Sequence, residues 1–221
     1  MADFIQNYGE ILLVATGETL YMVLLSTLFA YLLGLPLGVL VYLTDRDSLL
    51  PNRPINAVLG WIINIGRSIP FIILIVALIP FTRLIAGKAI GSTAAVIPLV
   101  IGATPFVARM VESSIRELDP GVIECAKAMG ANTLQIVWKV ILPEILPSLV
   151  RGGAIATITI VGYTAMAGTV GGGGLGDVAI RYGYHRYEYD VMLATIVILV
   201  LIVQLIQILF HLAAKKIEKN H

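Results

Sequence analysis

The sequence predicts an all-α integral membrane protein with five transmembrane helices. Of its 221 residues, 58% are hydrophobic and only 13% are charged, whereas about 25% of residues are charged in a typical soluble domain. The charged residues are also clustered, and the long uncharged runs between them can supply the roughly 20 helical residues that cross a hydrocarbon core. Four such runs are Thr19–Thr44, Ala89–Ala108, Gly152–Gly176 and Val191–Ala214.

A fifth crossing is expected over Ile62–Phe81. This segment is apolar, but it contains Arg67 near its start and Pro70 inside it. An arginine near a helix end can extend its charged group to the membrane interface, so the segment remains a candidate span. Five crossings place the two termini on opposite sides of the membrane.

The basic residues predict the orientation. If the polar stretch after Leu118 is cytoplasmic, the outer segments hold Arg83, Lys88, Arg181 and Arg186. The inner segments then hold 11 of the 15 Lys and Arg residues: Arg46, Arg53, Arg67, Arg109, Arg116, Lys127, Lys139, Arg151, Lys215, Lys216 and Lys219. Positive residues concentrate on the cytoplasmic side, so the N-terminus is expected outside and the C-terminus inside.

The stretch DPGVIECAKAMGANTLQIVWKVILPEILP, which follows Leu118, predicts two short helices joined by a bend. Asp119 is suited to cap the first helix with Pro120 at its first position, and Gly130 allows the left-handed conformation that ends it. Thr133 is expected to cap the second helix. One face of that helix would carry Leu134, Val137, Trp138 and Ile141. We interpret the stretch as a docking element; an amphipathic segment lying on the membrane is the alternative.

The spacing inside this stretch is specific. Gly130 follows Glu124 by six residues, and Leu142–Pro143 follows Gly130 by twelve. This resembles the cytoplasmic signature of the membrane subunits of binding-protein-dependent ABC importers: Glu-Ala-Ala, three residues, Gly, nine residues, Ile, one residue, Leu-Pro. The chain departs from it at Cys125 and Val140, which keep small or apolar character. The resemblance implies an ATPase-docking loop over about residues 117–147, with these coupling residues: Glu124, Cys125, Ala126, Gly130, Val140, Leu142 and Pro143.

Four further stretches, GETLYMVLLSTL, NIGRSIPFIIL, IGATPFVARMVESSIRELDPGVIE and GYTAMAGTVGGGGLGD, resemble the methionine-uptake branch of this family. The resemblance runs from about Gly17 to Leu212. It implies the type I ABC importer permease fold and a permease for D- or L-methionine in a bacterial inner membrane. The implied partners are a second copy of the chain, two cytosolic ABC ATPase subunits and an extracytoplasmic methionine-binding protein. A permease for another small amino acid, or a membrane anchor for a cytosolic protein, are the alternatives.

The expected organisation is one transmembrane domain over residues 15–214, set in the lipid bilayer. An N-terminal interfacial segment, residues 1–14, precedes it, and a cytoplasmic tail, residues 215–221, follows. No linker or internal repeat is evident.

The sequence argues against several kinds of chemistry. It contains no nucleotide-binding Walker motif, so ATP and Mg²⁺ are expected on the partner ATPase, with no enzymatic activity or cofactor in this chain. His185 has no second His or Cys at ligand spacing, which argues against a metal site. The glycine run from Gly171 to Gly176 lacks the Gly-Lys-Ser/Thr of a phosphate loop, and we expect a flexible turn or a close backbone contact there. A net charge of +1 argues against a nucleic-acid partner.

The fourth span, from about Ser148 to Val170, is rich in small residues. Small side chains let helices approach closely, so two copies of this span are expected to meet near a central axis. Its bulky members Tyr163 and Met166 are candidate residues of the translocation pathway; gap filling within the subunit is the alternative.

Three other patterns are ambiguous. Gly34, Pro36 and Gly38 indicate a packing notch or a kink in the first span. The tyrosines of RYGYHRYEYD, residues 181–190, indicate either an aromatic belt or a surface for a partner. On the last span, Gln204, Gln207 and His211 share one helical face, which suits hydrogen bonds between helices or a position of His211 at the inner interface.

Overall fold

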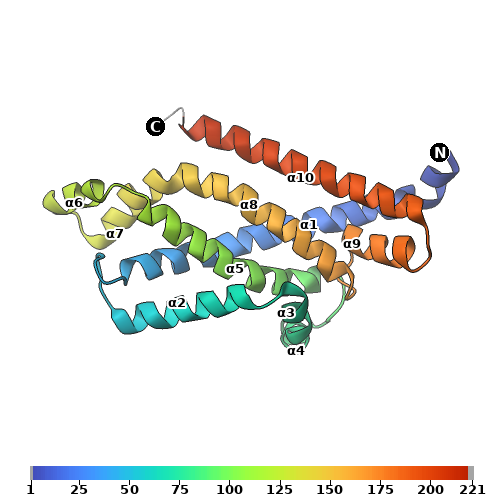
Figure 1. Cartoon of the computed structure of the whole chain (residues 1–221), viewed down its shortest axis with the longest axis horizontal. Coiled ribbons are helices and arrows are strands. Elements are labelled where there is room, and N and C mark those ends of the chain that lie inside the picture. The colour runs from blue at the N-terminus through green and yellow to red at the C-terminus, as the bar shows by residue number, and fades with distance from the viewer. Residues whose placement is uncertain (1, 219–221) are drawn as a thin grey trace.

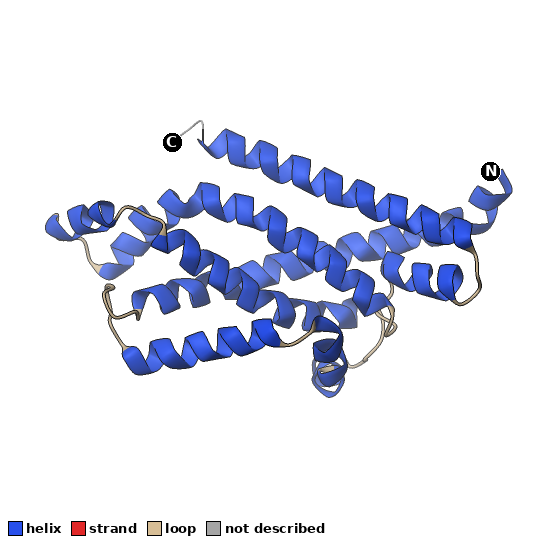
Figure 2. Cartoon of the chain, viewed as in Figure 1, coloured by secondary structure: helices blue, strands red, loops and turns tan. Residues whose placement is uncertain are grey.

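The computed structural model describes residues 2–218, and nearly all of them are helical (Figure 2). Met1 and the end of the predicted tail, including Lys219, lie outside the described residues. The long helices α1, α5, α8 and α10 lie alongside one another (Figure 1). In chain order the elements are α1 (Ala2–Leu43), α2 (Arg53–Ser68), α3 (Phe71–Ala77), α4 (Ile79–Ala86), α5 (Ser92–Arg116), α6 (Pro120–Ala128), α7 (Thr133–Ile136), the π-helical turn η1 (Val137–Ile141), α8 (Leu142–Gly168), α9 (Gly174–Val178), the π-helical turn η2 (Ala179–Tyr184) and α10 (Tyr189–Glu218).

Four stretches of helix in the described chain are long and apolar enough to cross a membrane: Gln6–Leu43, Ser92–Arg116, Thr133–Gly168 and Tyr189–Ile217. A fifth crossing is available if α2 and α3 count as one broken span, because the pair passes the same test together but bends by 104°. The predicted all-α architecture with up to five crossings is therefore confirmed.

The expected crossing over Ile62–Phe81 is wrong in its bounds, because the broken span runs from Arg53 to Ala77. The helix begins earlier, at Arg53, and ends at Ser68. Ile69 is extended, with φ −82° and ψ 123°, because the residue before a proline is pushed out of the helical region. Pro70 itself has no N–H to continue the helical ladder. Arg67 consequently lies in the last turn of α2, beside the break.

Helix α1 has 42 residues, so it is roughly 63 Å long at 1.5 Å per residue. This is about twice the ~30 Å hydrocarbon core, so part of α1 must tilt or lie outside that layer. The structure shows no break at the expected boundary between residues 14 and 15. The N-terminal segment is the first part of the same helix.

Close packing of α1 on α5 forms the centre of the bundle. A Cβ atom on Gly34 would lie 2.8 Å from the side chain of Val107, and one on Gly38 would lie 2.4 Å from the Ala108 carbonyl oxygen. The predicted packing notch is therefore confirmed. Pro36, between the two glycines, lies within the continuous helix.

Much of the outside of the bundle is apolar. Large side chains along α1, including Leu24, Leu28 and Leu32, are more than half exposed. Only 11% of the most apolar window of α10 is buried inside the chain. Apolar surfaces of this extent have to be covered by lipid or by another subunit.

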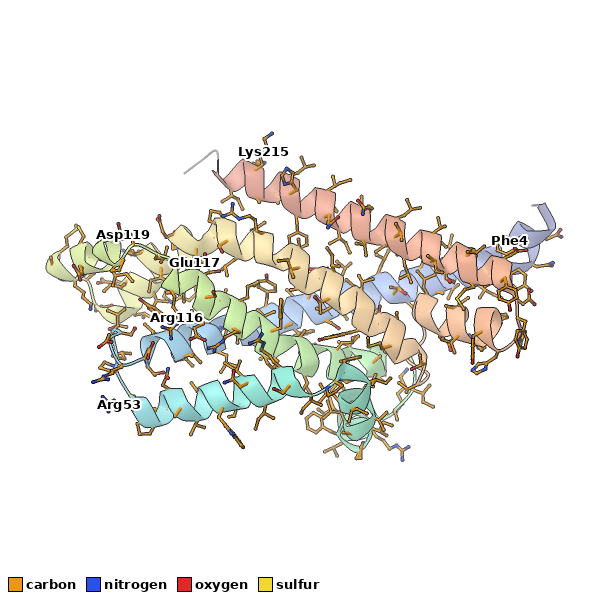
Figure 3. All side chains as sticks on the ribbon, in the orientation of Figure 1. Phe4, Arg53, Arg116, Glu117, Asp119 and Lys215 are labelled. Atoms are coloured by element: carbon orange, nitrogen blue, oxygen red, sulfur yellow. The ribbon has the colours of Figure 1, made fainter. Side chains whose placement is uncertain are left out.

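The two ends of the bundle differ. The hairpin of α6 and α7 lies at one end with the connection from α1 to α2, whereas α9, η2 and the N-terminus lie at the other (Figure 1). Arg53, Arg116, Glu117 and Asp119 gather at the hairpin end, and Phe4 lies at the opposite end (Figure 3).

Candidate coupling loop and translocation surface

Helix α6 begins and ends as its sequence predicts. The Asp119 side chain accepts a hydrogen bond from the Gly121 N–H (2.8 Å), and Pro120 occupies the first helical position. At the other end Gly130 has φ +79°, in the left-handed region. The N–H of Gly130 donates to the Lys127 oxygen and the N–H of Ala131 to the Ala126 oxygen, the paired bonds of a Schellman helix end. The bend at Gly130 is therefore confirmed.

The second helix is capped one residue earlier than expected. Asn132, and not Thr133, is the N-cap: its side chain accepts from the Gln135 N–H (2.9 Å), and the Gln135 side chain accepts from the Asn132 N–H (3.0 Å). Thr133 is the first residue inside α7. This reciprocal capping box satisfies two backbone donors together, whereas a threonine cap at position 133 would satisfy one.

The second helix of the hairpin continues directly into the fourth span. Residues Thr133–Gly168 form one helical run of 36 residues that joins α7, η1 and α8. In η1 the Leu142 N–H donates to the Val137 oxygen, the wide spacing of a π turn. Pro143 follows at once and has no N–H to donate, so the ladder is adjusted at this point without being broken. Leu142 and Pro143 therefore lie inside a continuous helix.

The hairpin is attached to the bundle by a few apolar side chains. Ile123, Ile136, Val137 and Ile141 are buried. Leu134 and Trp138 are 68% and 65% exposed, so the single apolar face expected for the second helix is divided between contact and surface. Of the predicted coupling residues, Glu124, Cys125 and Gly130 are exposed, whereas four are partly buried: Ala126, Val140, Leu142 and Pro143.

The most exposed apolar residue at the bend is Met129, at 82%. Among the described residues, no hydrogen bond or ion pair joins the Glu124 side chain to another residue of the hairpin, and Glu124 is exposed. It lines a shallow cleft with Asp47 and Arg116.

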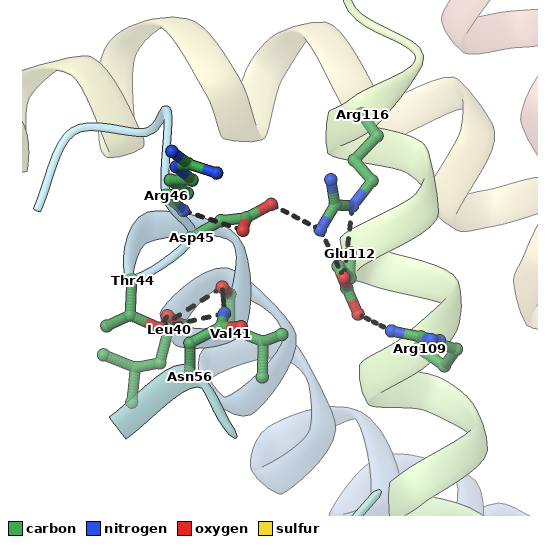
Figure 4. Close-up of polar contacts among 9 residues, drawn as sticks. All are labelled: Leu40, Val41, Thr44, Asp45, Arg46, Asn56, Arg109, Glu112 and Arg116. Atoms are coloured by element: carbon green, nitrogen blue, oxygen red, sulfur yellow. Dashed lines mark hydrogen bonds and ion pairs between the residues drawn. The ribbon is translucent and has the colours of Figure 1, made fainter. Parts of the chain in front are cut away.

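A charged network that the sequence reasoning missed lies beside the hairpin (Figure 4). The side chain of Glu112 is only 3% exposed and accepts hydrogen bonds from Arg109 (2.6 Å) and from Nε and Nη2 of Arg116 (3.1 and 2.9 Å). Nη2 of Arg116 also donates to Oδ2 of Asp45 (2.7 Å). The signal in the sequence was Glu112 itself, with arginines three residues before it and four after it.

The network fixes the end of α1 against the end of α5. The Asn56 side chain adds a bond from α2, donating to the Val41 oxygen (2.7 Å). The pKa of Asp45 is held below its usual range, first by the hydrogen bond from the Arg46 backbone N–H and also by Arg116. Arg116 lies at the hairpin end of the molecule (Figure 3).

The two faces of α8 have different roles. Most of its small residues face inward: a Cβ on Gly152 would lie 2.0 Å from the Met110 sulfur, and one on Gly153 would lie 2.6 Å from the Phe210 ring. The expectation that this small-residue face joins two copies of the chain is therefore wrong, because it packs against α5 and α10 of the same chain. The exposed face carries Met166, which is 45% exposed.

Tyr163 is held beside that exposed face by an aromatic contact. Its ring stacks on the ring of Phe71, with centroids 4.3 Å apart and planes within 3° of parallel. Phe71 is buried at the start of α3, next to the break at Pro70. The broken span α2–α3 therefore contacts α8 through Phe71, at a position three residues before Met166.

The glycine run forms a close backbone contact, as one of the two expectations stated. Gly173 and Gly174 have φ +77° and +74°, a conformation that glycine adopts without strain. The Gly174 N–H donates to Glu18 (2.7 Å) and the Leu175 N–H to Thr19 (2.9 Å). The run therefore fastens α9 to α1.

The tyrosine-rich loop lies at the same end of the bundle. Tyr8 of α1 donates a hydrogen bond to Glu188. The Arg186 guanidinium lies 4.6 Å from the centre of the Tyr182 ring. Tyr184, Tyr187 and Tyr189 are exposed. Within residues 2–218, no group of three His, Cys, Asp or Glu side chains is placed to hold a metal ion.

A bundle of membrane-length helices with an exposed helical hairpin at one end defines a multi-span membrane protein. Residues 34–219 match the family described as binding-protein-dependent transport system inner membrane component, and the chain belongs to this family.

The chain is 51% identical over 218 residues to the probable D-methionine transport system permease protein MetI of Vibrio cholerae, covering 99% of this chain and 97% of the relative. It is 47% identical over 206 residues to the methionine import system permease protein MetP of Bacillus subtilis, covering 93% of each. One solved structure, of inward-facing MetNI methionine ABC transporter, matches with a TM-score of 0.92 and 48% identity over 93% of this chain and 95% of that chain. An amino acid ABC transporter matches with a TM-score of 0.76 at 21% identity and shares the fold. The type I importer permease fold is thus confirmed.

Proposed function

We propose that this chain is the permease subunit of an ATP-driven methionine importer and that two copies form the translocation pathway. The proposal is supported by family membership and by relatives near 50% identity whose names specify methionine. Two cytosolic ABC ATPase subunits bind ATP and Mg²⁺, and an extracytoplasmic binding protein delivers the amino acid.

The continuity of Thr133–Gly168 is the observation that carries the mechanism. Its 36 residues extend roughly 54 Å as a helix, longer than the ~30 Å hydrocarbon core. Closing of the ATPase dimer moves the hairpin, and a continuous helix passes that movement to Tyr163 and Met166 near its other end. The span therefore acts as a lever in the transition between inward-open and outward-open states.

The hairpin surface suits a protein partner. Exposed Met129 and Leu134 supply apolar contact area, and Glu124 and Lys127 supply charges beside it. An apolar centre with a polar rim is typical of protein interfaces. We assign this end of the molecule to the cytosol, with the C-terminus inside and the N-terminus outside, in agreement with the excess of basic residues at the hairpin end.

At the other end, the tyrosine-rich loop is our candidate for contact with the binding protein. Tyr184, Tyr187 and Tyr189 are exposed on this loop, and the Tyr8–Glu188 hydrogen bond holds the loop against α1. Tyrosine provides large, rigid contact area with little loss of conformational entropy, which suits repeated docking.

Reconstitution tests the function. The permease, its ATPase and its binding protein are placed in proteoliposomes, and uptake of labelled D- and L-methionine is measured with and without ATP. We expect ATP-dependent uptake that unlabelled methionine suppresses and other amino acids do not. Uptake of a different amino acid would replace methionine in the proposal, and ATPase binding without any uptake would support the anchor alternative.

Single cysteines test the orientation in a Cys125→Ala background. A cysteine replacing Asn132 is expected to react with a membrane-impermeant thiol reagent from the cytosol, and one replacing His185 only from outside. Reaction of the Asn132→Cys protein from outside would overturn the assignment of the hairpin to the ATPase.

A further inference from the structure

A groove between α8 and the second half of α10 carries polar side chains at membrane depth. It has a volume of about 450 Å³, and its polar lining consists of Arg151 from α8 and Gln204, Gln207 and His211 from α10. Gln204 lies near the middle of the uncharged run Val191–Ala214. Amide groups at that depth are costly when they face hydrocarbon, and such residues usually face a bundle interior or a water-filled cavity.

The polar groups occupy only one edge of α10. Gln204, Gln207 and His211 follow one another at spacings of three and four, so they share a face. Leu209 is 57% exposed and points roughly 160° away from Gln207 around the helix axis. One edge of the exposed surface is therefore suited to water and the other to lipid or an apolar partner.

The groove continues along the exposed face of α8. Arg151, Ile155, Gly162 and Met166 are all exposed, and their spacings of four, seven and four place them in one stripe. A Cβ atom on Gly162 would meet no other atom within 4 Å, so the surface is open there. The stripe leads from Met166 to the groove at Arg151, towards the hairpin end of the molecule.

We propose that Arg151, Gln204 and Gln207 line the water-filled cytoplasmic half of the translocation pathway. This inference rests on the proposed function, and it names the side chains that contact the transported amino acid. Each amide has an oxygen that accepts from an ammonium group and an NH₂ that donates to a carboxylate, so Gln204 and Gln207 replace water around a zwitterionic amino acid. The Arg151 guanidinium draws the carboxylate towards the cytosolic exit.

An acidic phospholipid in the groove is the competing occupant. Its phosphate would lie at the interface, where it could meet Arg151 and His211. Gln204 lies seven residues from His211 along α10, roughly 10 Å deeper in the membrane, and would face only acyl chain. A pathway for water and a polar solute accounts for both amides.

Thiol labelling in the complete transporter tests the proposal. Cysteines replace Gln204, Gln207 or, as the matched control on the opposite edge, Leu209, each in the Cys125→Ala background. A charged methanethiosulfonate is added from the cytosolic side in the absence of ATP. We expect positions 204 and 207 to react roughly tenfold or more faster than 209, because a thiol in hydrocarbon stays protonated and unreactive. Saturating methionine should slow their reaction.

The outcomes separate the possibilities. Reaction of 204 and 207 with uncharged N-ethylmaleimide but not with the charged reagent would show lipid in the groove and overturn the proposal. Failure of both reagents would show that a second subunit covers it, with the same consequence. If the background protein takes up methionine in either case, the proposed function stands and only the pathway assignment fails. If 204 and 207 react but no preparation transports methionine or is protected by it, the role of the amides in contacting that solute is overturned.

Discussion

The guanidinium group of Arg116 and the carboxylate of Asp45 lie 2.7 Å apart, joining the end of α5 to the turn after α1. Arg116 also binds the buried carboxylate of Glu112, so one side chain connects a core position to a surface turn. Helix α6 follows Arg116 after a short turn. The network therefore holds the end of α5, from which the hairpin begins, against the end of α1.

Replacing Glu112 with Gln should destabilise the permease. The change removes charge-assisted bonds to Arg109 and Arg116, whose side chains are 43% and 50% exposed and are thus partly solvated. Charge-assisted hydrogen bonds contribute about 1.5–3 kcal/mol each. Because water partly solvates both arginines and weakens these bonds, we expect the free energy of unfolding to fall by roughly 2–3 kcal/mol in total.

The measurement is thermal unfolding in detergent, and Glu117→Gln is the matched control. Glu117 lies at the exposed end of the same helix, where a surface substitution is expected to change stability by no more than about 0.5 kcal/mol. Equal effects of the two substitutions would show that the Glu112 network does not hold the helices together.

Acid should weaken the Asp45 contact only at low pH. Its folded-state pKa is lowered, so its contribution is fully present above the unfolded-state pKa of about 3.9 and is lost as pH falls through the folded value. The difference in melting temperature between wild type and Asp45→Asn should therefore be the same at pH 7 and pH 5. It should shrink below about pH 4. A difference that already shrinks between pH 7 and pH 5 would contradict this assignment.

The sequence predicted the fold where a residue acts through its own backbone. Asp119, Pro120 and Gly130 begin and end α6 as expected, because a cap, a fixed φ and a left-handed turn are local properties. The second helix is capped by Asn132 and not by Thr133. Both residue types can cap a helix, so the local sequence pattern does not decide between these two neighbours.

Contacts between distant elements could not be read from the sequence. The small residues of α8 are compatible with packing against a second copy or against the same chain, and only the structure shows Gly152 against Met110. The Arg116–Asp45 pair joins residues 71 positions apart. The π turn before Pro143 likewise depends on a helix that continues on both sides of the proline.

The bend at Gly130 is expected to tolerate Asn and not Val. No other atom lies within 4 Å of the site, so the cost of Val is backbone strain at φ +79° and not a clash. Left-handed conformation costs roughly 1–2 kcal/mol for most residues, and Asn is the common exception. Gly130→Val should therefore uncouple ATP hydrolysis from uptake, and Gly130→Asn should restore coupling. ATPase and uptake assays on the same proteoliposomes measure this, and equal coupling in all three proteins would remove the bend from the mechanism.

Two glycines of α8 should respond to Ala with opposite signs. A Cβ on Gly168 would lie 2.2 Å from the Asp177 nitrogen, a backbone atom that cannot move aside, whereas Gly162 has no neighbour within 4 Å. Gly168→Ala should cost roughly 1–3 kcal/mol of stability or more through overpacking. Gly162→Ala should gain up to about 1 kcal/mol from helix propensity. Melting temperatures in detergent compare them, and a Gly168→Ala protein as stable as wild type would show that α8 and α9 do not pack this closely.

Replacing Met166 with Ala should increase leakage through the closed pathway. Met166 is a large apolar side chain on the exposed stripe of α8, three residues after Tyr163, whose ring stacks on Phe71. A ring of apolar side chains excludes water without a charge, and a flexible thioether can still yield when the helices separate. Passive methionine efflux from loaded proteoliposomes without ATP should rise in Met166→Ala and remain at the wild-type level in Leu209→Ala.

Two copies of a Met166→Cys chain in the Cys125→Ala background should also form a disulfide with each other in one state of the ATPase cycle and not in the other. Unchanged efflux together with no crosslink in either state would reduce Met166 to a packing residue and place the closed gate elsewhere on the stripe.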